Sequence, residues 1–80
     1  MIHYSNVYVI KKALKSFPGL SCKANNKRVD VFDNKRRFVG TVLNEGKLFF
    51  IYDDKYIPLV EEIIEKCKAL HNTYLEIYVK

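Results

Sequence analysis

The chain has little glycine, proline or cysteine. Its 80 residues include three Gly, two Pro and two Cys, while 49% are hydrophobic and 29% are charged. This composition excludes a disordered tail and predicts a folded globular domain. A chain of this length provides material for one core rather than two, and it contains no low-complexity stretch or internal repeat. We therefore expect a single domain over residues 1–80.

The sequence also lacks a segment long and apolar enough to target or cross a membrane. The longest uncharged run near the start covers residues 1–10, is interrupted by polar side chains and is far too short to span a bilayer. We therefore expect no membrane partner, and the cytoplasm is the default location.

Residues that carry catalysis or bind metals are scarce. Cys22 and Cys67 are 45 residues apart and His3 and His71 are 68 apart, so neither pair has the spacing of a metal site. We expect no enzyme, no metal and no cofactor. The apolar surroundings of the two cysteines favour reduced, buried thiols, and a bridge stays open as the alternative if the fold brings the sulfur atoms together.

Positive charge is present, and its excess lies almost entirely in the first half of the chain. Residues 1–40 contain nine Lys and Arg against two acids, a formal +7, whereas residues 41–80 contain five against seven, a formal −2. The whole chain therefore carries +5. An asymmetry of this kind predicts a positive face and points to a polyanionic partner.

A first amphipathic pattern predicts a helix near the start of the chain. Ser5 suits its N-cap, and the residues that follow at spacings of three and four are Val7, Ile10, Leu14 and Phe17. Residues 7–10 are all strand-prone, so a strand is the alternative, but the stripe continues to Phe17 and favours a helix that stops before Pro18.

A second pattern predicts a helix in the second half. Pro58 suits its first turn, and His71 and Asn72 suit its C-terminus. Its buried face is predicted to consist of Val60, Ile63, Ile64, Cys67 and Leu70.

Turn residues divide the rest of the chain into short strands. They are expected at residues 20–24, 28–32, 38–43, 47–52 and 74–79. The run 48–52 is apolar on both pleat faces, which predicts a strand covered on both sides. The expected order is α-β-β-β-β-α-β, a small α+β domain with an antiparallel β-meander sheet and both helices on one face.

The basic residues form the first candidate site. They are Lys11, Lys12, Lys15, Lys27, Arg28, Lys35, Arg36 and Arg37. The lysines share one face of the first helix, whereas the two basic turns lie at opposite ends of the strand between them and cannot form one cluster. Guanidinium groups bind phosphate bidentately and Lys binds it as a point charge, so a groove along this surface would hold a nucleic-acid backbone. The alternatives are solubilising charge that protects strand edges, or contact with an acidic protein surface.

Tyr74 and Tyr78 form a second candidate site. They point to one side of the last predicted strand, opposite its aliphatic residues. If Phe50 and Tyr52 share that side, the sheet presents an aromatic platform on which bases stack at roughly 1 to 3 kcal/mol each. A second small core or a homodimer contact is the alternative.

These observations predict a small basic binding module that contacts DNA or RNA phosphates through its positively charged N-terminal half. The alternative is a protein-binding inhibitor or regulator, of the kind that viruses and mobile elements encode, that docks on an acidic or nucleic-acid-binding surface of a larger protein. If the acidic second helix lies beside the first, its carboxylates offset the lysines there. Lys35, Arg36 and Arg37 would then be the best contacts for a partner.

Overall fold

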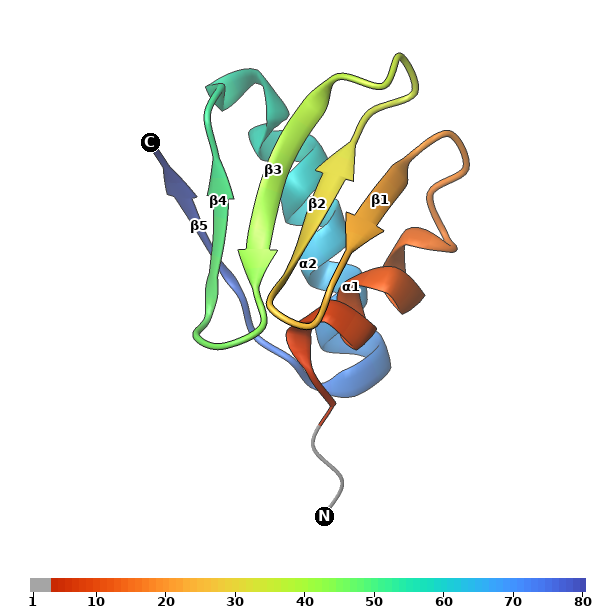
Figure 1. Cartoon of the computed structure of the whole chain (residues 1–80), viewed down its shortest axis with the longest axis vertical. Coiled ribbons are helices and arrows are strands. Elements are labelled where there is room, and N and C mark those ends of the chain that lie inside the picture. Colours follow the sequence, from red (N-terminus) through yellow and green to blue (C-terminus); the bar gives the residue numbers. More distant parts are fainter. Residues whose placement is uncertain (1–3) are drawn as a thin grey trace.

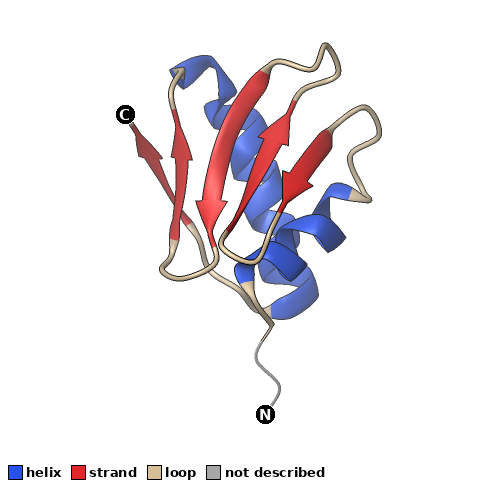
Figure 2. Ribbon diagram, in the orientation of Figure 1, coloured by secondary structure: helices blue, strands red, loops and turns tan. Residues whose placement is uncertain are grey.

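Two helices lie against one face of a five-stranded sheet in the computed structural model of the chain, which describes residues 4–80 (Figure 1). The helices are α1 (Asn6–Leu14) and α2 (Ile57–His71), and a 3-10 turn, η1 (Asp54–Tyr56), leads into α2. The strands are β1 (Ser21–Ala24), β2 (Arg28–Phe32), β3 (Phe38–Leu43), β4 (Leu48–Ile51) and β5 (Glu76–Val79). The predicted α+β class and the order of its elements are confirmed (Figure 2).

The strands lie in the order β1-β2-β3-β4-β5, so neighbours in the chain are neighbours in the sheet. The first four form the predicted antiparallel meander. β5 departs from the predicted antiparallel sheet, because it pairs with β4 in parallel, with Leu48 opposite Glu76 and Ile51 opposite Val79. The physical reason is α2, since a helical crossover between two neighbouring strands returns the chain in its original direction.

α1 is a helix rather than a strand, as the apolar stripe predicted. The Ser5 hydroxyl accepts a hydrogen bond from the backbone N–H of Tyr8 at 3.2 Å and caps the first turn. The residues that α1 buries are Val9, Ile10, Ala13 and Leu14. The helix ends at Leu14, and Phe17 packs against the core from the turns that follow.

α2 begins and ends where its sequence signals place it. Pro58 lies in the first turn, and Asn72 ends the helix in the left-handed conformation at φ 54°. Val60, Ile63 and Cys67 are buried as predicted, but the prediction for Leu70 is wrong, because its side chain is 48% exposed. His71 is half-buried, and its ring lies 4.7 Å from that of Tyr4 and 5.6 Å from that of Tyr8.

The hydrophobic core fills the space between the helices and the sheet. Its fully buried sheet residues are Val29, Val31, Val39, Val42, Phe49 and Ile51. The alternate side chains of the same strands face away from the helices, and no element within residues 4–80 covers that side (Figure 1). The expectation that residues 48–52 are covered on both sides is therefore met only on the helix side, and Tyr52 is 51% exposed.

Candidate functional site

The basic residues of the first candidate site lie in three separate places. Lys11, Lys12 and Lys15 lie along α1, and Lys27 and Arg28 lie where the β1–β2 turn enters β2. The residues at 35–37 form the β2–β3 turn at the opposite end of β2 (Figure 1). The structure does not bring these groups into one patch, so each has to be considered separately.

The α1 lysines border a shallow hollow. It has a volume of about 360 Å³ and is lined by Ser5, Val7, Tyr8, Lys11, Lys12 and Lys15. The Lys12 ammonium lies 5.6 Å from the centre of the Tyr8 ring, within reach of a cation–π contact. The Tyr8 ring in turn stacks on Tyr4 at 4.9 Å. This part of α1 is therefore a positive surface on the helix layer, away from the sheet.

The β1–β2 turn is closed by hydrogen bonds to Asn25, and part of its charge is neutralised. The side-chain oxygen of Asn25 accepts hydrogen bonds from the backbone N–H groups of Lys27 and Arg28, at 2.7 and 3.0 Å. The Arg28 guanidinium lies 3.6 Å from a carboxylate oxygen of Asp30, so Arg28 already has an anionic partner.

The β2–β3 turn is fixed by the carboxylate of Asp33. This carboxylate accepts hydrogen bonds at 2.8 Å from the backbone N–H groups of Lys35 and Arg37. The Arg37 guanidinium and the Tyr56 hydroxyl also donate to it, at 3.2 and 2.9 Å. Within the turn Arg36 has a positive φ of 63°, which few non-glycine residues adopt. The Asp33 network thus holds the turn and the residues ahead of α2 together.

This arrangement gives the three basic residues of the turn different roles. Arg37 is already paired with Asp33. Arg36 forms no ion pair among residues 4–80, and it lines a hollow of about 410 Å³ together with Lys23 and Phe32 of the neighbouring strands. Lys35 likewise forms no ion pair within residues 4–80. Arg36 is therefore the member of the turn that both lines this hollow and keeps its charge uncommitted.

The Asp33 network makes stability depend on pH. Hydrogen bonds, the largest contribution coming from the Arg37 backbone N–H, lower the pKa of Asp33 from 3.8 to about 2. Because the folded-state pKa lies below the unfolded one, the stabilisation is present above about pH 4 and is lost as the pH falls towards 2. We expect the urea midpoint of the wild type to fall over this range, and to fall less in Asp33→Asn. An equal fall in both proteins would contradict this role of the Asp33 carboxylate.

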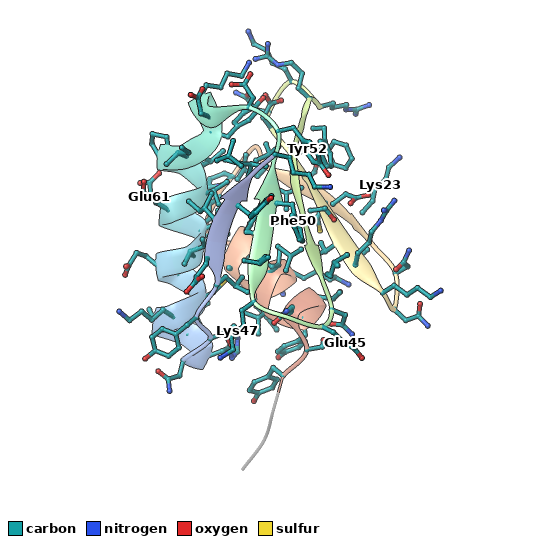
Figure 3. The ribbon with its side chains drawn as sticks, turned by 90° about the vertical axis from the view of Figure 1, so that its left-hand side faces the viewer. Lys23, Glu45, Lys47, Phe50, Tyr52 and Glu61 are labelled. Atoms are coloured by element: carbon teal, nitrogen blue, oxygen red, sulfur yellow. The ribbon has the colours of Figure 1, made fainter. Side chains whose placement is uncertain are left out.

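The second candidate site lies on the side of the sheet away from the helices, which we call the open face. Its members, from the alternation of each strand against the buried core, are Ser21, Lys23, Arg28, Asp30, Phe32, Phe38, Thr41, Leu43, Leu48, Phe50, Tyr52, Glu76, Tyr78 and Lys80. Figure 3 shows Lys23 and Tyr52 on this side of the sheet and Glu61 of α2 on the other. The open face thus carries aromatic and basic side chains together.

The aromatic rings on the open face contact one another. The centres of Phe32 and Phe38 are 5.9 Å apart, and those of Phe38 and Tyr52 are 5.6 Å apart. Phe50 and Tyr78 form an edge-to-face pair at 5.6 Å. The Lys80 ammonium lies 5.7 Å from the Phe50 ring and 5.8 Å from the Tyr52 ring, and so joins the two groups of rings.

A β-bulge places Phe38 on this face. Val31 pairs with Gly40, but Phe32 pairs with Phe38, so Val39 is an extra residue in β3. Val39 is buried with the core, and the alternation of side chains between the two faces of the sheet shifts by one residue at this point. Strict alternation from Gly40 would have pointed Phe38 into the core, so the bulge is what extends the row of rings onto β3.

The two tyrosines singled out from the sequence lie apart. Tyr78 belongs to β5 and packs on Phe50. Tyr74 precedes β5, and its hydroxyl donates a hydrogen bond to the Asn72 side chain at 2.8 Å. The Lys68 ammonium of α2 lies 5.5 Å from the Tyr74 ring. Tyr74 therefore lies at the C-terminal end of α2, and only Tyr78 joins the platform with Phe50 and Tyr52.

The sequence interpretation missed Phe32, Phe38, Lys23 and Lys80. A signal for Phe32 was present, because it shares the period-2 phase of Arg28 and Asp30 rather than that of the buried valines. Phe38 had no such signal, since its position depends on the bulge. Lys80 becomes part of the face only because β5 runs parallel to β4 and brings its end beside Tyr52.

The remaining candidates from the sequence are the cysteines and histidines. Cys22 and Cys67 are both free, and burial raises the pKa of Cys67 to about 11. Across residues 4–80 no group of His, Cys and acidic side chains could hold a metal ion. None of the described helices has the length and apolar character needed to cross a membrane. His3 lies outside the described residues.

No protein-family model, curated protein or solved structure matches the chain. The function of the protein is therefore inferred from its own surfaces.

Proposed function

We propose that the protein binds nucleic acid, and that the cations around the open face contact its phosphates. The observation that carries the proposal is the hollow at one corner of this face, where Lys23 and Arg36 lie together beside Phe32. Neither cation is paired with a carboxylate within residues 4–80. Two uncommitted cations on one surface favour a ligand with repeated negative charges.

The distribution of acids supports the same orientation. Three carboxylates, Glu61, Glu62 and Glu65, are exposed on α2, on the opposite layer of the molecule. The open face has two acids, and one of them, Asp30, lies beside Arg28. These carboxylates disfavour a polyanion along this part of α2, whereas the lysines of α1 form a separate positive surface in the same layer.

The experiment compares two double variants that change the net charge equally. Lys23→Gln/Arg36→Gln removes the two cations of the hollow, whereas Lys66→Gln/Lys68→Gln removes two from α2. Binding of labelled single- and double-stranded oligonucleotides is followed by fluorescence anisotropy at several salt concentrations. We expect the first variant to reduce the slope of log K against log salt by about 1.4, which is roughly 0.7 per lost phosphate contact on a single strand. The α2 variant should keep the wild-type slope.

Two outcomes would overturn the proposal. One is a wild-type protein that binds neither single- nor double-stranded oligonucleotides at about 50 mM salt, where phosphate contacts are strongest. The other is an equal loss of slope in both double variants, because the binding surface would then not be the one that contains Lys23 and Arg36.

A further inference from the structure

We infer that the open face binds single-stranded nucleic acid, with unpaired bases stacked on its aromatic side chains. This inference rests on the proposed function and adds to it the form of the nucleic acid and the residues that hold the bases. It depends on three properties of the face, namely its exposed rings, the placement of cations around them and the lack of any cover.

The rings are available to a ligand. Phe38, Tyr52 and Tyr78 are 41%, 51% and 49% exposed, although each of them contacts another ring. Contact with neighbours restricts their rotamers, so little side-chain entropy remains to be lost when a flat ligand is added. Aromatic rings held in this way on a sheet present the flat surfaces on which bases stack.

The aromatic rings of Phe32, Phe38 and Tyr52 form a row across the sheet, and its length fits a short segment of single-stranded nucleic acid. Phe32, Phe38 and Tyr52 lie on or at the end of three neighbouring strands, and Lys80 follows at the end of β5. Neighbouring strands are about 4.8 Å apart, so the row from β2 to β5 crosses about 14 Å. Sheet platforms of this size stack two or three bases.

Cations lie at both ends of this row. Lys23 and Arg36 lie beside Phe32 at one end, and the Lys80 ammonium lies over the Phe50 and Tyr52 rings at the other. A strand that crosses the sheet along the row can therefore place its bases on the rings and its phosphates near the cations. A duplex cannot bind in the same way, because its bases are already stacked on one another.

The charge of the face also argues against a second copy of the chain as its occupant. A twofold contact places each face against an identical one. Lys23, Arg36 and Lys80 would then meet a surface whose acids are Asp30, already beside Arg28, and Glu76. Three unpaired cations would have one uncommitted carboxylate to meet, whereas a nucleic-acid strand supplies one phosphate per nucleotide.

The test replaces single rings and measures which form of nucleic acid the variant loses. Phe38→Leu and Tyr52→Leu keep an apolar side chain on the sheet but remove the flat ring. Tyr74→Leu is the matched control, because Tyr74 is 54% exposed and lies at the end of α2, off the open face. The probes are an oligothymidylate and an oligouridylate of about 15 nucleotides, long enough to cross the face, and a duplex of the same length.

We expect each face variant to bind both single strands at least about fivefold more weakly than the wild type, the lower end of the effect of losing one stacked base. The salt slope should not change, because no cation is lost, and Tyr74→Leu should bind as the wild type does. The chain contains six Tyr and no Trp, so quenching of tyrosine fluorescence provides a second readout. The quenching caused by a single strand should be smaller in Tyr52→Leu than in Tyr74→Leu.

The outcomes separate this inference from the proposed function. If Phe38→Leu and Tyr52→Leu bind single strands as tightly as the wild type, or if the duplex binds as tightly as the single strands, the stacking inference is wrong. The proposed function would still stand if Lys23→Gln/Arg36→Gln showed the expected reduction in the slope of log K against log salt. A dimer seen by light scattering in the wild type and abolished in Tyr52→Leu would assign the face to a second copy and overturn the inference.

Discussion

Replacing Gly40 with alanine is expected to lower the free energy of unfolding by about 3 kcal/mol, the upper end of the usual cost of overpacking. Gly40 lies within β3 on the side that faces the helices, paired with Val31 and Ile51. A Cβ at Gly40 would overlap the carbonyl oxygen of Phe50 and would lie 3.0 Å from atoms of Ile51 and Phe49. The first of these neighbours is backbone, and the other two side chains are fully buried, so relief requires β3 and β4 to separate.

Urea unfolding followed by circular dichroism measures this loss, and Gly46→Ala provides the control. Unlike Gly40, Gly46 has a backbone conformation that favours glycine, with φ at 96°, but a Cβ there meets no atom within 4 Å. Its replacement should therefore cost only the backbone strain, about 1 kcal/mol. A loss from Gly40→Ala that is no larger than the loss from Gly46→Ala would contradict the close packing of β4 on β3. Since a chain of this size is stable by roughly 4 to 12 kcal/mol, the Gly40 variant should lose a large share of its stability.

The second large effect is expected in the salt dependence of binding. Two cations of the open face, Lys23 and Lys80, and Arg36 in the hollow at its corner are unpaired with carboxylates within the described chain. If each neutralises one phosphate of a single strand, log K should fall against log salt with a slope of about −2.1. Affinity should therefore fall about 20-fold between about 50 and 200 mM salt.

Anisotropy titrations of the wild type with the oligothymidylate at several salt concentrations measure this slope. A ring variant such as Phe38→Leu is the control, because it should weaken binding at every salt concentration without changing the slope. An affinity that stays constant over the same range would mean that phosphate contacts contribute nothing, and would contradict the account of how the cations act.

The arrangement of the strands could be predicted from local sequence because the turns carry clear signals. Asn25 and Asn26, the pair at 33–34 and Gly46 separate the strands, and the bounds of β2 and β3 agree with the sequence pattern. The parallel pairing of β5 could not be predicted in the same way. It depends on where α2 returns the chain, which is a property of the whole fold rather than of residues 74–79.

The composition of the candidate site was predicted less well, for reasons that involve particular residues. Tyr74 and Tyr78 have the spacing of one strand face, but β5 begins at Glu76, so Tyr74 follows the end of α2. Phe38 faces outwards because of the bulge at Val39, which no pattern in the sequence marks. Arg36 and Arg37 are adjacent in the sequence, yet Asp33 engages one and leaves the other uncommitted.

The fold also separates the basic residues that give the first half of the sequence its positive charge. The lysines of α1 belong to the helix layer, and the cations that reach the open face come from three other places in the chain, namely β1, the β2–β3 turn and the end of β5. A positive half of the sequence therefore does not become one positive face. The unpaired charge at the open face comes from Lys23, Lys80 and the neighbouring Arg36, and the first two lie outside the basic clusters seen in the sequence.

The most direct test of the central claim is to map the oligothymidylate on the protein by the shifts of its backbone amide resonances. Binding on the open face predicts the largest shifts at Arg36, Phe38, Tyr52 and Tyr78, with little change along α2. The largest shifts at Lys11, Lys12 and Lys15 of α1, with none on β3 to β5, would contradict the claim that the open face holds the strand.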